Sequence, residues 1–155
     1  DMIEQGLEAE EIVKRVNELA GKVDASFVIN SLEYLYKGGR CSALSMLGAN
    51  LLKLKPCIEV KNGKMGVGKK YRGKFSDVLL EYVKERLADK DDIVTNRVFI
   101  THAGCDEETV KAVTELVKKL VSFDEVFVTK ASCTISSHCG ADTLGVLFVR
   151  KSDVS

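Results

Sequence analysis

Residues 97–130 carry the patterns of a strand, a helix and a second strand in close succession. Arg97–Ala103 and Glu125–Lys130 are short and rich in β-branched and aromatic residues, which is typical of strands. Between them, residues 106–121 repeat valine and leucine at helical spacing. A run of this length favours parallel pairing of the two strands through a right-handed crossover. The sequence therefore predicts an α/β fold.

Antiparallel pairing is also expected, because Asn62-Gly63 separates two short strand patterns. A type I′ turn needs positive φ at both central residues, and Asn-Gly meets that need. Further strands are expected at Ser26–Asn30 and Leu144–Arg150, and helices at residues 8–20, 42–53 and 75–87. We expect a mixed-sheet α/β sandwich with helices packed on the sheet, and 155 residues suit a single domain.

The charge of the chain is balanced but not evenly spread. Lys plus Arg and Asp plus Glu are both 23, which argues against a dedicated nucleic-acid-binding protein. Residues 61–74 nevertheless carry six basic residues and no acid: Lys61, Lys64, Lys69, Lys70, Arg72 and Lys74. This hairpin is either a solvated face, a nucleic-acid-binding module, or a docking surface for an acidic protein or membrane that acts with Arg40.

The turn Gly38-Gly39-Arg40 lies between a short apolar-periodic run and Ser42, a good helix N-cap. The pattern predicts a helix, a two-glycine stop and a second helix. Arg40 beside a helix N-terminus makes an anion site possible, with glycines that let a ligand approach the backbone. An ordinary interhelical turn with a solvated arginine remains the alternative.

Residues 131–143 form the densest polar stretch, which we expect to be a loop between two strands. Ser136, Ser137, His138 and the backbone near Gly140 could donate hydrogen bonds to a carboxylate or phosphate. An ordinary connection with a solvated histidine is the alternative.

Five cysteines, with no CxxC pair and no signal sequence, indicate a reducing cytoplasm. A zinc site or a thiol nucleophile is conceivable, because His102 lies near Cys105, and Cys133 lies near His138-Cys139. The spacing is poor for zinc, so no metal and no cofactor are expected. A thiol- or metal-dependent enzyme that uses His138 with Cys133 or Cys139 stays open as an alternative function.

Four motifs occur in the order of one known family: Lys37-Gly-Gly-Arg40, Lys55-Pro56, Lys70-Tyr-Arg72-Gly and His138-Cys-Gly140. Together they resemble the C-terminal half of the DegV family of bacterial fatty-acid-binding proteins, over essentially the whole chain. The resemblance implies that residues 1–155 are the C-terminal lobe of a two-lobed protein. The N-terminal lobe is then absent from this chain, and residues 1–24 form a helix that leads in from it.

The same resemblance implies a lipid carrier and not an enzyme. A long-chain fatty acid would lie between the two lobes, with its carboxylate held by His138 near Ser136, Ser137 and Gly140. Arg40, Arg72 and the glycines at 38 and 39 would form a rim that faces the head-group and a fatty acid kinase partner. A transient membrane contact would come from the basic hairpin acting with Arg40, and no nucleic-acid partner is expected. The family loop usually reads His-x-Gly-Pro-Gly, whereas Ala141 and Asp142 follow Gly140 here, which adds a negative charge.

Overall fold

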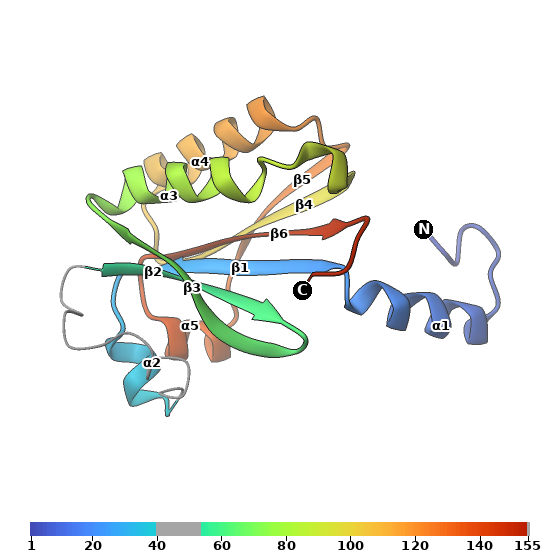
Figure 1. The fold of residues 1–155 in the computed structure, drawn as a ribbon, viewed down its shortest axis with the longest axis horizontal. Helices are drawn as coiled ribbons and strands as arrows, with labels where there is room; N and C mark the ends of the chain where they lie inside the picture. Colours follow the sequence, from blue (N-terminus) through green and yellow to red (C-terminus); the bar gives the residue numbers. More distant parts are fainter. Residues whose placement is uncertain (40–53, 155) are drawn as a thin grey trace.

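The computed structural model describes residues 1–39 and 54–154, which form a six-stranded mixed sheet with helices on both faces (Figure 1). The strands are β1 (Val23–Ile29), β2 (Leu54–Lys61), β3 (Lys64–Arg72), β4 (Ile93–Ala103), β5 (Glu125–Lys130) and β6 (Thr143–Arg150). The helices are α1 (Ala9–Ala20), α2 (Glu33–Lys37), α3 (Phe75–Arg86), α4 (Glu107–Leu120) and α5 (Cys133–Cys139), with a 3₁₀ turn at Lys90–Asp92. The strand order is β3-β2-β1-β6-β4-β5, and β4 and β5 pair in parallel.

The main sequence-based predictions of structure are confirmed. Asn62 and Gly63 both have positive φ, as the type I′ turn between β2 and β3 requires. The strand, helix and strand predicted between residues 97 and 130 are β4, α4 and β5. The mixed-sheet α/β sandwich is therefore correct. The predicted helix at residues 42–53 and the residue Arg40 lie outside the described residues.

The prediction of a loop at residues 131–143 is wrong, because this stretch contains helix α5. Serine, threonine and cysteine have low helix propensity, so the composition indicated a loop. The structure recruits the same hydroxyls to the helix: the Ser132 side chain caps its N-terminus by accepting from the Ile135 N–H at 3.4 Å. Gly140 ends it with φ 78° and ψ 178°, a conformation that side-chain-bearing residues rarely adopt.

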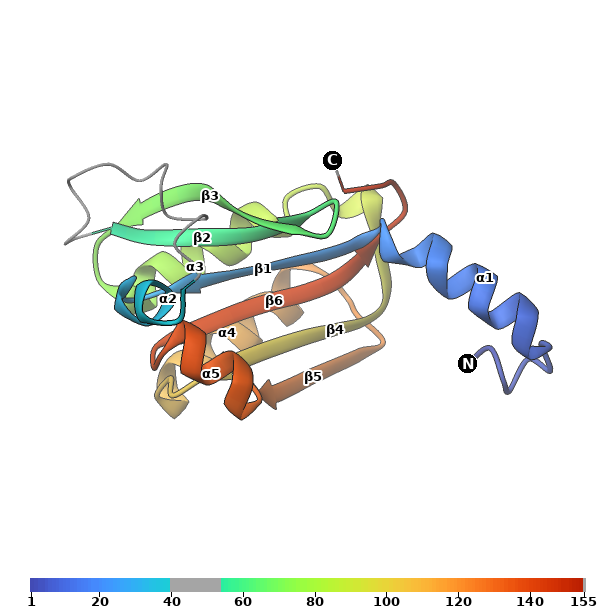
Figure 2. The ribbon, with the colours of Figure 1, turned by 90° about the horizontal axis from the view of Figure 1, so that it is seen from below.

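Each face of the sheet has its own core. The larger core lies under α3 and α4, where Val98, Ile100 and Val146 of the sheet meet Tyr82 and Val113 of the helices. The smaller one lies under α2 and α5 and consists of Ile29, Leu35, Ile58 and Cys139. Figure 2, seen from the side of α2 and α5, shows that these two short helices cover one end of this face of the sheet, and that no other helix of the described residues covers the rest.

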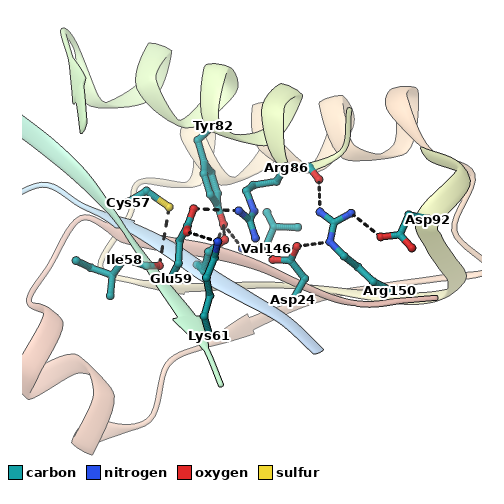
Figure 3. Close-up of polar contacts among 11 residues, drawn as sticks. Asp24, Cys57, Ile58, Glu59, Lys61, Tyr82, Arg86, Asp92, Val146 and Arg150 are labelled. Atoms are coloured by element: carbon teal, nitrogen blue, oxygen red, sulfur yellow. Dashed lines mark hydrogen bonds and ion pairs between the residues drawn. The ribbon is translucent and has the colours of Figure 1, made fainter. Parts of the chain in front are cut away.

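A buried ion network links β1, α3 and β6 on the α3 face (Figure 3). The Asp24 carboxylate, 1% exposed, accepts hydrogen bonds from Arg86 and, at 2.6 Å, from Nε of Arg150. Glu59 and Asp92 add one further contact each, to Arg86 at 3.1 Å and to Arg150 at 3.4 Å. Such a network aligns the two strands with the helix that covers them.

Helix α1 precedes the sheet and extends away from the end that lies opposite to α2 and α5 (Figure 1). It confirms the helix predicted at residues 8–20 and runs from Ala9 to the cap at Gly21. No residue of α1 is buried, and its apolar stripe includes the exposed Val13 and Val16. The apolar side of α1 is therefore exposed, and the described residues do not bury it.

Candidate functional site

The sheet topology brings most of the predicted site residues to one end of the sheet. β1 ends at Ile29, which pairs with Thr143 at the start of β6. Leu54, at the start of β2, pairs with Arg72 at the end of β3. Helices α2 and α5 lie side by side at this same end in both ribbon views (Figures 1 and 2). This end of the sheet therefore holds four of the predicted site residues. Gly38 and Gly39 follow α2, and His138 and Gly140 lie at the end of α5.

His138 packs directly against Gly38, the C-cap of α2. A Cβ built on Gly38 would lie 2.3 Å from Nδ1 and 3.2 Å from Cε1 of the imidazole. Nδ1 is buried and has no hydrogen-bond partner among the described residues. The Nδ1 edge of the ring therefore faces α2, and Nε2 is the nitrogen farther from it.

The two predicted serine ligands donate their hydroxyl protons to backbone carbonyls of residues earlier in the same stretch. Ser136 Oγ donates to the carbonyl of Ala131 at 3.3 Å, and Ser137 Oγ donates to that of Thr134 at 2.9 Å. Either hydroxyl must rotate away from its carbonyl before it can donate to a ligand. His138 is thus the side chain of α5 best placed for a polar ligand contact.

Tyr34 of α2 is a site residue that sequence reasoning missed. A Cβ built on Gly140 would lie 2.2 Å from Cδ2 of Tyr34, so the ring rests on the glycine backbone. The aromatic run around Tyr34 and Tyr36 is visible in the sequence, but nothing local to it points to a glycine about a hundred residues later. The contact exists only because α2 and α5 share one end of the sheet.

A second feature that sequence reasoning missed is a row of apolar side chains across the open face of the sheet. Strand pairing aligns one residue from each strand, in the order Met65, Val60, Ala25, Leu147, Phe99 and Phe127. Met65, Phe99 and Phe127 are 45%, 37% and 38% exposed, and the two phenylalanine rings stack at 5.1 Å. We call these six residues the apolar row. At about 4.8 Å per strand, it is roughly 24 Å long.

The short helices bound this row on one side. Phe27, the next residue of β1 on the same face, packs against the small core under α2 and α5. The apolar row therefore borders the end of the sheet where His138 lies. An uncovered apolar strip next to a polar group is the arrangement expected for a ligand with a long apolar tail and a polar head.

The charges of the hairpin are partly neutralised by acids of the same chain. Lys69 forms ion pairs with Glu81, at 2.9 Å, and with Glu85, both on α3. Lys61 lies 3.7 Å from Glu59. Arg72, the predicted rim residue at the end of β3, is exposed. These pairs weaken the case for a nucleic-acid interface on the hairpin.

Two thiols near the site, Cys139 and Cys105, lack the lowered pKa of a nucleophile. Burial raises the pKa of Cys139. Burial, with Asp142 and Asp106 nearby, raises the pKa of Cys105 to about 12, and its thiol donates to the Thr143 carbonyl at 3.3 Å. A thiol needs a lowered pKa to be a nucleophile near neutral pH. Within residues 1–39 and 54–154, no three His, Cys, Asp or Glu side chains are grouped so as to hold a metal ion.

His102 lies elsewhere, between Lys130 and Leu144 in the sheet. It lines a groove of about 600 Å³ between α4 and the edge strand β5, together with Cys105 and Lys130. Burial, followed by the charge of Lys130, lowers the pKa of its imidazole. His102 is therefore not part of the arrangement around His138.

Asp142, the acidic residue that follows Gly140-Ala141, is held by the chain itself. The side chain of Asn30 donates to its carboxylate at 3.2 Å, and the Asn30 N–H donates to its carbonyl at 3.0 Å. Its φ is 55°, in the left-handed region. As for membrane insertion, no helix in the described part of the chain is both long and apolar enough to cross a bilayer.

Comparison with known proteins gives a consistent result. A protein-family model described as "Uncharacterised protein, DegV family" matches residues 1–151. A fatty acid-binding protein of Thermotoga maritima is 30% identical over 149 residues, which cover 94% of this chain and 50% of that protein.

Two solved structures are similar in sequence and in fold. One, a DegV family protein from Thermus thermophilus described by its fatty acid binding, is 26% identical with a TM-score of 0.81, over 96% of this chain and 53% of that one. The other, a Thermotoga maritima protein described as revealing a fatty acid binding function, is 27% identical with a TM-score of 0.75, over 96% of this chain and 51% of that one.

This chain thus spans about half the length of the relatives that it matches. Fatty acid binding is the property named for all three of these relatives. Because the family model extends over residues 1–151, the resemblance first seen at Gly38-Gly39 and His138-Cys139-Gly140 is confirmed, and the chain belongs to the DegV family.

Proposed function

We propose that this chain is one half of a long-chain fatty acid site that is completed by a second, N-terminal lobe of the same protein. The observation that carries the proposal is the apolar row, which is open to solvent and borders the end of the sheet that holds His138. Relatives that bind fatty acids are about twice as long as this chain, which leaves room in them for a second lobe. That lobe would cover the row and enclose the acyl chain.

The energetics favour such an arrangement. Each methylene that moves from water onto an apolar surface contributes about 0.8 kcal/mol, so a long acyl chain gains most of its affinity from a strip like the apolar row. The carboxylate needs donors to offset its loss of water. In the proposal, His138 supplies one through Nε2, Gly140 lies beside it, and Ser136 and Ser137 contribute only if they rotate.

We place the head-group end of the site at the surface, where Arg72 faces a fatty acid kinase that phosphorylates the bound acid. Arg40 stays a second predicted rim residue and lies outside the described residues. Arg72 is exposed at the end of β3, on the same end of the sheet as α2 and α5. The proposed setting is the bacterial cytoplasm, with a transient membrane contact during loading. No cofactor and no nucleic acid take part in the proposed activity.

The test of lipid binding uses the full-length protein. Fatty acid is expected to co-purify with it, as detected by mass spectrometry, and His138→Ala is expected to weaken binding of oleate or palmitate roughly 10- to 150-fold. That range corresponds to the loss of one hydrogen bond to a charged group, worth about 1.5–3 kcal/mol. An empty protein that also fails to bind added palmitate or oleate would contradict the proposal.

The kinase role predicts a different pattern for the rim. Arg72→Glu should leave fatty acid affinity within about twofold, yet slow kinase-dependent phosphorylation, because a reversed charge at an interface chiefly slows association. Lys64→Glu is the matched control: it makes the same charge change at the other end of β3, roughly 26 Å away along the strand. If both variants slow phosphorylation equally, the effect is a general one of charge and not one of Arg72. Loss of lipid binding in Arg72→Glu would contradict the assignment of Arg72 to the kinase contact and of His138 to the ligand.

A further inference from the structure

Helices α2 and α5 meet through two reciprocal contacts between a ring and a glycine. The imidazole of His138 on α5 rests on Gly38 of α2, and the ring of Tyr34 on α2 rests on Gly140 of α5. In both places an added Cβ would lie closer than 2.5 Å to the ring, so both contacts depend on glycine. Each helix therefore offers one ring and one glycine to the other.

Between these contacts, the helices share the small core of the open face. Leu35 and Cys139, each next in sequence to one of the contact residues, are both buried in it with Ile29 and Ile58. The distance between α2 and α5 is thus set at three neighbouring points. Neither helix holds its place alone, since α2 has five residues and α5 has seven, well below the length at which isolated helices are stable.

We infer that Tyr34 and Gly38 are positioning residues for His138. Gly38 accommodates the Nδ1 edge of the imidazole, and Tyr34 holds the C-terminal end of α5 against α2, so that the ring keeps one orientation with Nε2 on the far side. The value of this orientation for a carboxylate ligand rests on the proposed function, whereas the positioning itself does not.

Tyr34 acts through its ring and not through its hydroxyl. The atoms closest to the Gly140 position are Cγ, Cδ2 and Cε2, ring carbons that phenylalanine also has. Phenylalanine should therefore preserve the contact and alanine should abolish it. A requirement for the hydroxyl would appear as a failure of phenylalanine to substitute.

Nuclear magnetic resonance can test the inference without any ligand, because the 155-residue chain contains only two histidines. Each gives one Hε1–Cε1 signal, and His138→Gln assigns the pair. In Tyr34→Ala, the His138 signal should shift or broaden while the His102 signal stays in place. In Tyr34→Phe, both signals should match those of the unmodified chain.

A second variant changes the contact between Gly38 and His138. Gly38 has φ −77°, which alanine adopts freely, so the effect of Gly38→Ala comes from its Cβ and not from backbone strain. That Cβ must displace the imidazole, and the His138 signal should shift at least as much as in Tyr34→Ala. Gly66→Ala in β3 is the matched control, because an added Cβ there meets nothing within 4 Å.

An unchanged His138 signal in both Tyr34→Ala and Gly38→Ala would overturn the inference, and so would equal movement of the two histidine signals, which reports a general structural change. Failure of Tyr34→Phe to restore the signal would overturn the role assigned to the ring. The full-length protein separates this inference from the proposed function: normal signals with no fatty acid bound would refute only the function. Unchanged signals in Tyr34→Ala and Gly38→Ala, alongside normal binding, would refute only the positioning role.

Discussion

Replacing Asp24 by asparagine is expected to lower the free energy of unfolding by about 3 kcal/mol, measured by urea denaturation. Removal of one partner from a buried ion pair typically costs about 3–5 kcal/mol, because the remaining charge stays buried without compensation. Asp24 is 1% exposed and serves two arginines, whose side chains are 17% and 16% exposed. The lower end of the range applies here, since Glu59 and Asp92 still contact Arg86 and Arg150.

The size of this effect depends on burial, and a matched exposed pair shows the contrast. Glu11 and Arg15 form an ion pair one helical turn apart on α1, and both side chains are more than 40% exposed. Glu11→Gln makes the same chemical change as Asp24→Asn and should cost no more than about 0.5 kcal/mol. If Asp24→Asn lowers the free energy of unfolding by less than about 1 kcal/mol, or if the two variants lower it by similar amounts, Asp24 is not the centre of a buried network.

The network also matters for the proposed site, although it lies on the opposite face. Asp24 is followed in β1 by Ala25, whose side chain points to the open face and belongs to the apolar row. The contacts of Asp24 with Arg86 and Arg150 tie β1 to α3 and β6, which keeps β1 in register beside β6. The alignment of the row thus depends on polar contacts on the other side of the sheet.

The elements that local sequence determines were predictable. Asn62-Gly63 identified the hairpin because its backbone requirement is local, and the β-branched and aromatic residues of Arg97–Ala103 identified a strand. Helix α5 was not predictable in this way. Its stability comes from Ser132, whose side chain caps it, and from Cys139 and Gly140, which pack against α2. Tertiary contact overrode weak intrinsic propensity there.

The candidate site was predictable only in part, for the same reason. His138 and the glycines at 38 and 140 were identified because they lie in recognisable motifs, and the structure brings them to one end of the sheet. The apolar row could not be identified, because its six members come from six strands and are aligned only by the pairing register. Tyr34 was overlooked because its partner glycine is remote in sequence. Arg40, which the motif also suggested, lies outside the described residues.

Gly140→Ala is expected to lower the free energy of unfolding by about 2–6 kcal/mol in urea denaturation. Two costs add: about 1–3 kcal/mol for a side chain at φ 78° and ψ 178°, and about 1–3 kcal/mol for a Cβ that would lie 2.2 Å from the Tyr34 ring. Gly63→Ala separates these costs. Gly63 has φ 71° in the hairpin turn, but nothing lies within 4 Å of its added Cβ, so only the backbone cost applies. Equal losses in the two variants would rule out the clash with Tyr34.

A double-mutant cycle assigns the clash to its partner. Tyr34→Ala on its own removes the packing of the ring on Gly140, whereas in the Gly140→Ala background it also removes the obstacle that the new Cβ meets. Tyr34→Ala should therefore lower the free energy of unfolding less in the Gly140→Ala background, or even raise it, with a coupling energy of about 1–3 kcal/mol. Because backbone strain at residue 140 is the same with and without Tyr34, it cancels from the cycle. A coupling near zero would mean that the ring moves aside without cost, and Tyr34 could then not hold α5 in place.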